Sequence, residues 1–315
     1  MPSSADTVQT LADLARWPHT GPALAVLGHP IAHSLSPPMH NAALAALARE
    51  DPRYLDWRYF RFDVPPADLP RALDLLHEKK FCGLNLTVPH KILAFDLVAD
   101  TDAAARPIGA VNTLVWNEHG WHGHNTDGYG LAAAVRESLG RELAGAHIVL
   151  LGAGGAARAA AVECLRQSCA SLWIGNRTRA NLDIILAVLA PLAGNTPLHA
   201  FTLDAPPPNF PAGAIMIQAT VLGLHPGDSR PFDLRQLPHP AGVYDMTYTA
   251  ASATALVAQA RDLGLPSADG LAMLVHQGAK SLEVWTGAPA AQTAPIMRAA
   301  AEAARAGAKA EKLKG

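Results

Sequence analysis

The sequence is poor in cysteine, which limits the kinds of scaffold it can form. Only 3 of its 315 residues are cysteine, at Cys82, Cys164 and Cys169, and no Cys-x-x-Cys pair occurs. An odd number of unclustered cysteines argues against both a disulfide framework and a thiolate zinc site. We expect the three thiols to act as small hydrophobic side chains in the core.

Long apolar runs and a charge surplus are also lacking. The longest apolar stretch, 182–189, is interrupted by Asp183 and ends before Pro191, so it is shorter than the roughly 18 residues that a membrane span needs. Lys and Arg total 25 against 27 Asp and Glu, which leaves no basic excess to attract nucleic acid. No early Lys or Arg precedes an apolar run, as it would in a secretory signal. We expect a cytoplasmic protein without a membrane or nucleic-acid partner.

The 14 histidines include one cluster, His119, His122 and His124, that invites a metal hypothesis. The cluster lies around two glycines at an expected strand turn, and no acidic residue accompanies it in regular register. Because a metal site needs a set of ligands with regular geometry, we expect no metal.

The order of predicted elements indicates an α/β protein of two domains. A length of 315 residues fits two domains of about 150 residues each, and strands that alternate with helices predict parallel sheets. In the first half we expect strands at 24–27, 58–62 and 83–88, helices at 37–48 and 68–77, and a hairpin of 111–116 with 121–124. In the second half we expect strands at 147–151, 172–175, 214–219 and 243–246, helices at 156–167, 181–189 and 271–285, and a fraying helix from 299.

A glycine-rich turn joins the strand at 147–151 to the helix that follows. The segment is Gly152-Ala153-Gly154-Gly155-Ala156-Ala157. In the pattern G-x-G-x-x-A, the first glycine makes the turn, the second admits a pyrophosphate, and the alanine allows close packing of helix and strand. A glycine turn can also be purely structural, but a strand before it and a helix after it favour dinucleotide binding.

The end of the next strand indicates which dinucleotide. It reads Asn176-Arg177-Thr178-Arg179, without the carboxylate that usually binds the ribose hydroxyls of NAD. Arg177 can bind a ribose 2′-phosphate through two hydrogen bonds. NADP is therefore preferred, and the alternative is a solvated arginine pair that opens a helix.

Polar side chains follow several strands of the first half, at positions where α/β proteins bind ligands. Each alone is ordinary, since serines cap helices and a single lysine is usually a surface residue. They are Ser34, Ser36, Thr87, Lys91, Asn112 and Asp127.

Taken together and in order, these motifs resemble the shikimate dehydrogenase family. The resemblance runs from about residue 25 to 287. It rests on Ser-Leu-Ser-Pro, Asn-Leu-Thr-Val-Pro-His-Lys, Gly-Ala-Val-Asn-Thr, Asn-Thr-Asp-Gly, Gly-Ala-Gly-Gly-Ala, Asn-Arg-Thr, Tyr-Asp-Met-Thr-Tyr and Ala-Asp-Gly-Leu-Ala-Met-Leu-Val-His-Gln-Gly-Ala.

The resemblance implies an NADP-dependent, reversible reduction of 3-dehydroshikimate to shikimate, on the chorismate route to aromatic amino acids. It also implies an N-terminal α/β substrate domain and a Rossmann-type NADP-binding domain, with C-terminal helices that return to the first domain. The expected ranges are 21–126 for the substrate domain, 127–269 for the Rossmann domain, 270–300 for the returning helices, and 1–20 and 301–315 for tails.

The resemblance also implies roles for individual residues. Ser34 and Ser36 would hold the substrate carboxylate, and the other substrate contacts would be Thr87, Lys91, Asn112, Asp127, Tyr248 and Gln277. The cofactor contacts would be Gly152, Ala153, Gly154, Gly155 and Ala156 for the pyrophosphate, Asn176, Arg177 and Thr178 for the adenosine phosphate, and Met246 and Gly270 for the nicotinamide. Lys91 and Asp127 are the candidate acid and base, because reduction of a carbonyl requires a proton for the new hydroxyl.

Two positions depart from the family pattern. Gln218 stands where the family usually has Asn, so we expect a shift in the loop 221–227. The segment after Thr178 is short, which makes Arg179 a doubtful second phosphate ligand.

Several alternatives stay open at this point. One is a quinate/shikimate dehydrogenase that uses NAD or NADP, and another is a regulatory module that binds shikimate or nucleotide without catalysis. A methylenetetrahydrofolate dehydrogenase has a similar two-domain plan but would lack the Ser-x-Ser and Asn-Thr-Asp-Gly motifs. A homodimer is compatible with the sequence, which does not fix the oligomeric state.

Overall fold

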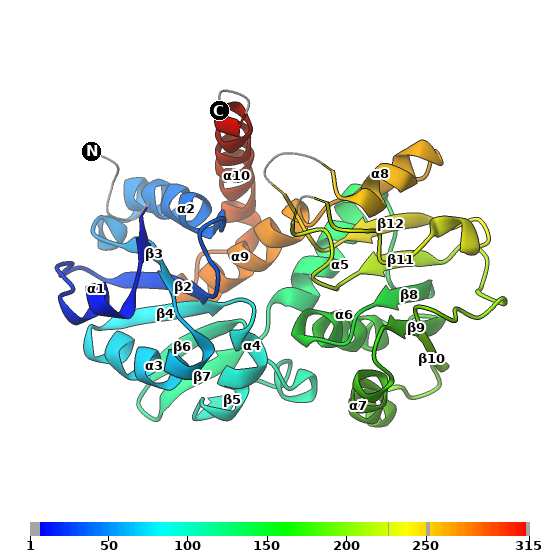
Figure 1. Ribbon diagram of the computed structural model, residues 1–315. Coiled ribbons are helices and arrows are strands. Elements are labelled where there is room, and N and C mark those ends of the chain that lie inside the picture. The colour runs from blue at the N-terminus through cyan, green and yellow to red at the C-terminus, as the bar shows by residue number, and fades with distance from the viewer. Residues whose placement is uncertain (1–6, 226, 250–252, 313–315) are drawn as a thin grey trace. The chain divides into compact units, whose positions relative to one another are not determined.

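The computed structural model describes residues 7–225, 227–249 and 253–312, and the chain divides into two compact units (Figure 1). Unit 1 comprises Met1–Thr126 and Gln277–Gly315, and unit 2 comprises Asp127–His276. The predicted α/β fold with parallel sheets is confirmed. The second division falls within helix α9 (Leu271–Thr286) rather than at residue 270.

Unit 1 is built on one sheet of seven strands, in the order β1-β3-β2-β4-β6-β7-β5. Strands β1 to β4 run parallel, whereas β6 is antiparallel to both β4 and β7. The bounds are Val8–Gln9 for β1, Ala23–Gly28 for β2, Arg58–Asp63 for β3, Phe81–Leu86 for β4, Asp100–Thr101 for β5, Thr113–Asn117 for β6 and Gly120–His124 for β7. All six residues of β2 are buried, as expected for a central strand with both faces covered.

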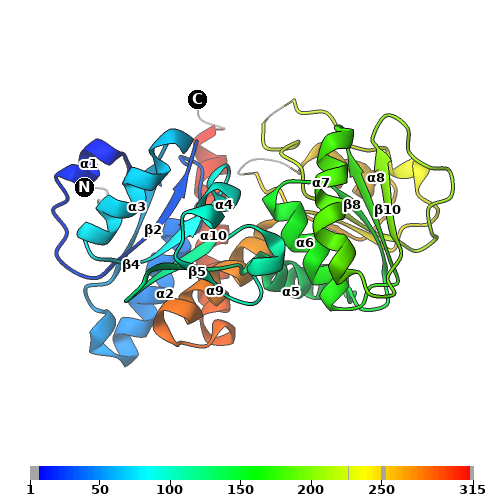
Figure 2. The same cartoon turned by 90° about the horizontal axis from the view of Figure 1, so that it is seen from below.

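Helices cover the sheet of unit 1. The main core contains Ala25 and Leu27 of β2 and packs against α1 and α3, while α2 packs against α10 and the strands β2 and β3. Figure 2 shows α1 and α3 on one side of this sheet and α2 and α9 on the other. The bounds are Leu11–Ala15 for α1, Ser36–Glu50 for α2, Leu69–Glu78 for α3, His90–Leu93 for α4 and Ala290–Lys312 for α10.

Both expected tails contribute to unit 1 in the part that is described. Strand β1 pairs with β3, Leu14 is fully buried, and the ring of Trp17 lies 4.7 Å from that of Phe60. At the other end, α10 begins at Ala290 and not at residue 299. Pro295 lies inside this helix, although a proline usually indicates a helix boundary. Residues 1–6 and 313–315 of the expected tails lie outside the described residues.

Among the strand boundaries that differ from the sequence prediction, two place candidate site residues outside a strand. Strand β4 ends at Leu86, so Thr87 lies in the turn that follows, and β6 begins at Thr113, so Asn112 precedes it. Both candidate ligands therefore belong to connecting segments, where side chains are better able to reach a ligand.

Unit 2 contains one parallel sheet of six strands in the order β10-β9-β8-β11-β12-β13. Counted along the chain this is 3-2-1-4-5-6, the order of the dinucleotide-binding Rossmann fold. The strand bounds are His147–Leu151 for β8, Ser171–Asn176 for β9, Leu198–Thr202 for β10, Ile215–Gln218 for β11, Gly242–Asp245 for β12 and Ser267–Ala268 for β13. The helix bounds are Asp127–Leu139 for α5, Gly155–Arg166 for α6, Arg179–Leu189 for α7 and Ala255–Asp262 for α8. The strand order reverses between β8 and β11, and such a switch point is where ligands bind.

Two of the three cysteines are buried, as the sequence predicts. Cys164 and Cys169 lie in the interior, and burial raises the pKa of Cys169 to about 11, whereas Cys82 is only partly buried.

Within the described ranges, no helix is both long and apolar enough to cross a membrane.

Candidate functional site

The loops after β2 and β4 lie against each other at one edge of the unit 1 sheet. The backbone N–H of Thr87 donates to the carbonyl of Leu27 at 3.0 Å, and that of His29 donates to the carbonyl of Val88 at 3.1 Å. These bonds join the loop that leads to Ser34 with the turn that carries Thr87.

The two candidate carboxylate ligands, Ser34 and Ser36, lie at the start of α2. The backbone N–H of Ser36 donates to Oγ of Ser34 at 3.3 Å. Arg61 of β3 holds this loop, since its Nη1 donates to the carbonyls of Ala32 at 2.6 Å and Ser34 at 3.3 Å. Two hydroxyls at the beginning of a 15-residue helix suit an anion such as a carboxylate.

Thr87, Lys91 and Asn112 lie on segments that are hydrogen-bonded to one another. The carbonyl of Lys91 accepts from the N–H of Val111 at 2.9 Å, and the carbonyl of Asn112 accepts from the N–H of Leu86 at 2.9 Å. The structure therefore brings together three candidate residues that are up to 25 positions apart.

Asn112 also reaches a residue from the far end of the chain. Its Nδ2 donates to Oε1 of Gln277 at 3.2 Å, across a separation of 165 positions, and to Oγ1 of Thr126 at 2.9 Å. The N-terminal substrate segment and the returning helix thus meet at two of the predicted substrate ligands.

Four buried polar residues beside these ligands were not among the predicted site residues. They are Asn85, Thr113, Thr126 and Ser281. Two signals could have found them: Asn85 is polar within the otherwise apolar strand β4, and Ser281 follows Gln277 by four positions, on the same face of α9.

His40 connects the start of α2 to this cluster. Its Nδ1–H donates to the carbonyl of Ser36 at 3.0 Å, and its ring stacks on Tyr59 with 4.1 Å between centroids. The hydroxyl of Tyr59 in turn donates to Oδ1 of Asn85 at 2.7 Å. Complete burial lowers the pKa of His40 from 6.5 to about 4, so this histidine is neutral near neutral pH.

In unit 2, Gly152 follows β8 directly, at the switch point of the sheet. Its φ is +121°, and a Cβ there would lie 2.8 Å from the carbonyl oxygen of Ala219, which follows β11. Its N–H donates to the carbonyl of Gly175 at 2.8 Å. Both the turn and the close approach of neighbouring strands therefore require glycine.

The rest of the turn fits a dinucleotide pyrophosphate. Gly154 is exposed, and a Cβ there would meet no atom within 4 Å. Gly155 and Ala156 open α6, whose first N–H groups point out of the helix end, and Ala157 is fully buried against the sheet. The open space and the N–H groups of the helix end suit an anion at the start of α6.

The end of β9 fits a ribose phosphate. Arg177 and Thr178 are exposed, and Nδ2 of the half-buried Asn176 donates to the carbonyl of Thr178 at 3.1 Å. Arg179 is the first residue of α7, and its Nε donates to Asp183 at 2.9 Å. Arg177 is therefore the arginine that remains in the loop itself.

The expected nicotinamide residues lie next to each other. A Cβ on Gly270 would lie 2.2 Å from the carbonyl oxygen of Met246, and the N–H of Gly270 donates to the carbonyl of Thr247 at 3.0 Å. Beside them, burial raises the pKa of Asp245, whose oxygens accept hydrogen bonds from the hydroxyls of Thr247 and Thr254. This network fixes the backbone that carries Met246.

Gln218 organises the loop that follows β11. Its Nε2 donates to the carbonyl of Leu222 at 2.7 Å, and its Oε1 accepts from the N–H of Thr220. Both polar atoms of the Gln218 amide are therefore hydrogen-bonded to the backbone of the loop. Pro226, which belongs to the expected segment 221–227, lies outside the described residues.

Unit 2 contains the two remaining predicted substrate contacts, Asp127 and Tyr248. Asp127 is buried and begins α5, directly after Thr126, and Tyr248 is half-buried after β12.

The histidine hairpin does have acidic partners, contrary to the sequence expectation. Nδ1 of His124 lies 2.8 Å from Oδ2 of Asp102, and Nδ1 of His122 lies 3.9 Å from Asp100, because β5 pairs with β7. Burial of Asp102 opposes its ionisation, but the hydrogen bonds that it accepts, first that from His124, outweigh burial and lower the pKa of this carboxyl. Over the described residues, no group of three or more His, Cys, Asp or Glu side chains is arranged to hold a metal ion.

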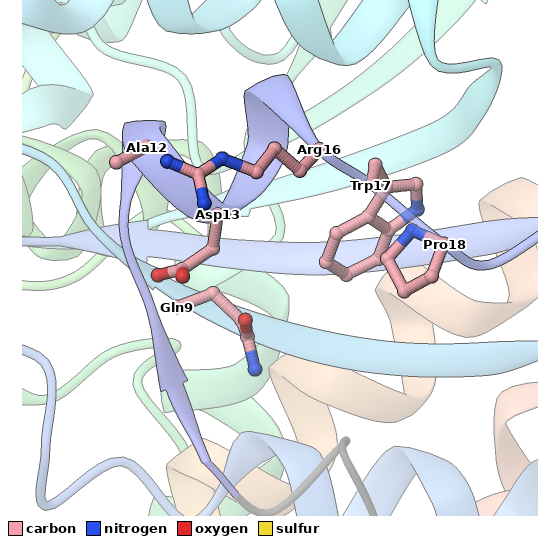
Figure 3. Close-up of a pocket in the computed structure, with 6 residues that line it drawn as sticks. All are labelled: Gln9, Ala12, Asp13, Arg16, Trp17 and Pro18. Atoms are coloured by element: carbon pink, nitrogen blue, oxygen red, sulfur yellow. The ribbon is translucent and has the colours of Figure 1, made fainter.

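A hollow of about 310 Å³ lies at the N-terminal segment of unit 1 (Figure 3). It contains none of the predicted site residues, and its carboxylate, Asp13, already accepts hydrogen bonds from the N–H and hydroxyl of Thr10. Its residues are Gln9, Ala12, Asp13, Arg16, Trp17 and Pro18.

Comparisons with known proteins identify the family of this chain. A family model described as "Shikimate dehydrogenase substrate binding domain" matches residues 26–114, and one described as "Shikimate 5'-dehydrogenase C-terminal domain" matches residues 270–302. A shikimate dehydrogenase (NADP(+)) of Symbiobacterium thermophilum is 39% identical over 290 residues, which cover 90% of this chain and 95% of that relative. The chain belongs to the shikimate dehydrogenase family.

Solved structures of the family have the same fold. A shikimate dehydrogenase in complex with NADP⁺ has a TM-score of 0.77 at 31% identity, covering 89% of this chain and 94% of that one. The shikimate 5-dehydrogenase of Thermus thermophilus, in complex with shikimate, has a TM-score of 0.74 at 33% identity, covering 90% and 99%. The predicted combination of a substrate domain with a Rossmann domain is therefore confirmed.

Proposed function

We propose that the chain catalyses the reversible, NADPH-dependent reduction of 3-dehydroshikimate to shikimate. The observation that supports this most is the meeting of Asn112 and Gln277 in unit 1, because two amides from distant motifs converge beside Thr87 and Lys91. Family membership and the Rossmann strand order of unit 2 support the same reaction.

In this proposal the substrate is oriented by groups matched to its chemistry. Ser34 and Ser36 bind the carboxylate, and Thr87, Asn112 and Gln277 bind ring hydroxyls by donating or accepting hydrogen bonds. Tyr248 provides a further contact. A site built to hydrogen-bond each hydroxyl discriminates strongly against analogues that lack one.

Lys91 and Asp127 are proposed to move the proton. The nicotinamide, when bound, supplies or accepts the hydride. In the direction of reduction, Lys91 donates a proton to the developing hydroxyl oxygen, and Asp127 stabilises the ammonium and orients it; in the reverse direction the pair removes that proton.

The cofactor residues are proposed from the fit of unit 2 to a dinucleotide phosphate. Gly152 to Ala156 surround the pyrophosphate, Met246 and Gly270 lie beside the nicotinamide, and Asn176, Arg177 and Thr178 bind the 2′-phosphate. Since Arg177 provides a fixed positive charge and residues 176–179 contain no carboxylate, NADP is preferred over NAD.

The test is a spectrophotometric assay of the purified protein with shikimate and with quinate, each with NADP⁺ and with NAD⁺. We expect turnover with shikimate and NADP⁺ to exceed the other three combinations. Equal rates with quinate would replace this proposal by a quinate/shikimate dehydrogenase, and no turnover in any combination would favour a non-catalytic binding module.

We also propose that the protein acts in the cytoplasm and that it assembles as a homodimer. Cell fractionation tests the first of these, and light scattering of the purified protein tests the second.

A further inference from the structure

A buried pair of hydroxyls lies behind the proposed substrate ligands of unit 1. Ser281 lies on α9, one turn after Gln277, and Thr113 is the first residue of β6. Both are fully buried, and Oγ of Ser281 lies 2.7 Å from Oγ1 of Thr113. Neither hydroxyl can exchange its partners for water without local opening, so each must be satisfied within the protein.

Thr113 and the backbone of Thr126 together set which way the amide of Asn112 points. The N–H of Thr126 can only donate, and it lies 2.9 Å from Oδ1 of Asn112, which identifies that atom as the oxygen. Oγ1 of Thr113 donates to the same oxygen at 3.0 Å. With both donors on one side, Nδ2 of Asn112 is directed to Oε1 of Gln277 at 3.2 Å.

The fixed amide of Asn112 in turn orients the side-chain amide of Gln277. Because its Oε1 accepts from Asn112, its Nε2 is turned away from Asn112. Ser281 lies against the same turn of the helix: because Thr113 uses its proton for Asn112, Ser281 donates to Oγ1 of Thr113, and its Oγ lies 3.0 Å from the backbone carbonyl oxygen of Gln277.

Asn85 closes the network on the side of the sheet. Its Nδ2 lies 3.0 Å from Oγ of Ser281, 3.1 Å from Oγ1 of Thr113 and 3.0 Å from the carbonyl of Asn112. Because the carbonyl of Asn112 can only accept, it identifies Nδ2 of Asn85, and Oδ1 of Asn85 therefore accepts from the hydroxyl of Tyr59. Ser281 and Thr113 therefore join β4, β6 and α9 at the point where the ligands emerge.

We propose that Ser281 and Thr113 are positioning residues that set the amide orientations of Asn112 and Gln277 for substrate hydroxyls. The inference rests on the proposed function, because it assumes that these two amides contact the substrate. It predicts an effect on substrate binding and none on the cofactor, whose proposed ligands all lie in unit 2.

The experiment compares hydroxyl-deleting variants with variants that retain the hydroxyl or delete a similar one elsewhere. Thr113→Val and Ser281→Ala delete the pair, and Thr113→Ser retains it. Thr286→Val is the matched control, because the hydroxyl of Thr286 lies on the same helix but donates to the carbonyl of Leu282 and accepts from the N–H of Ala288, away from Asn112 and Gln277. The measurements are kcat, the KM for shikimate, the KM for NADP⁺ and the melting temperature.

Both deletions are expected to raise the KM for shikimate about tenfold, since each removes a hydrogen bond that orients the amides of Asn112 and Gln277. The KM for NADP⁺ should stay within about twofold, and Thr113→Ser and Thr286→Val should resemble the wild type. An unchanged KM for shikimate in folded Thr113→Val and Ser281→Ala, or a parallel rise in both KM values, would overturn the inference.

Two further outcomes are distinguishable. If one deletion variant does not fold, the other decides the test, and a KM for shikimate equal to that of the wild type in the folded variant again overturns the inference. If the wild type itself does not turn over shikimate, the proposed function fails and this inference fails with it. If the wild type turns over shikimate and the deletion variants have an unchanged KM for shikimate, only the inference is overturned.

Discussion

At the residue scale, the candidate site separates polar groups that are proposed to act on ligands from polar groups that hold the site together. Arg177 is exposed in the loop after β9, whereas its neighbour Arg179 pairs with Asp183 on α7. In unit 1, the hydroxyls of Thr113 and Ser281 are buried and bonded to each other. Substitutions in the two groups should therefore differ in what they impair.

Replacing Lys91 by Ala tests the proposed proton transfer. Loss of a general acid typically lowers a rate by roughly 10² to 10⁴, so we expect kcat to fall by that factor with a smaller change in the KM for shikimate. Steady-state kinetics measure both, and Lys309→Ala, an exposed lysine on α10, serves as the control. A rise in KM with unchanged kcat would make Lys91 a binding residue only.

Replacing Arg177 by Ala tests the choice of cofactor. Removing a charge-assisted hydrogen bond to a phosphate should raise the KM for NADPH by about 10- to 100-fold. The KM for NADH, which has no 2′-phosphate, should change little. Arg179→Ala is the matched control because that arginine is engaged with Asp183, and equal effects of Arg177→Ala on both cofactors would contradict the assignment.

At the scale of elements, the turn between β8 and α6 contains glycines with two different tasks. Gly152 has a positive φ and faces the backbone of Ala219, while Gly154 has an ordinary φ of −80° and faces open space. The first is needed for the folded chain and the second for the approach of a ligand.

Alanine substitutions should separate these tasks. We expect Gly152→Ala to destabilise unit 2 by about 1–3 kcal/mol, through backbone strain and the clash with Ala219. Gly154→Ala should leave the melting temperature within a few degrees but raise the KM for NADP⁺ at least about tenfold, because the methyl group occupies the space of the pyrophosphate. Thermal denaturation and kinetics of the two variants decide this, and equal stability losses would refute the division of tasks.

The sequence predicts elements well where the local pattern is strong and less well where tertiary contacts decide. Strand β8 has the predicted bounds, since a short apolar run is followed directly by glycine. The two-residue strands β1 and β5 carry no such pattern and exist because β3 and β7 offer them an edge. The acidic partners of His122 and His124 were missed for the same reason, because β5 and the residue that follows it supply them from outside the hairpin.

The candidate site follows the same rule. Motifs predict Asn112 and Gln277 as substrate ligands, but only the fold reveals that Thr113, Thr126 and Ser281 surround them. Threonine and serine are common in helices and strands for many reasons, so a sequence without its fold gives no sign that these hydroxyls share one network.

At the scale of the whole molecule, stability should depend on pH through the buried His40. Its pKa is about 4 in the folded protein and 6.5 when unfolded, so the unfolded chain binds more protons between these values. Stability is then fully present above pH 6.5 and is lost as the pH falls towards 4, by up to roughly 3 kcal/mol.

Urea unfolding at about pH 7 and about pH 4.5, on either side of the unfolded pKa, measures this effect. Five of the 6 tryptophans belong to unit 1 and only Trp173 to unit 2, so tryptophan fluorescence mainly reports the unit that contains His40. His40→Gln should show a smaller loss between the two pH values than the wild type, whereas His119→Gln, at an exposed hairpin position, should behave like the wild type. Identical losses in all three proteins would contradict the role of His40.

The discontinuity of unit 1 has a consequence for the order in which the chain is made. Residues 127–276 form unit 2 without a break, but unit 1 needs Gln277–Gly315, including α10 against α2 and Ser281 against Asn85. Domains usually fold in the order of their synthesis. For this chain we expect the reverse: the second unit can fold while the ribosome is still at work, and the first, whose apolar sheet face is already exposed, completes its fold last.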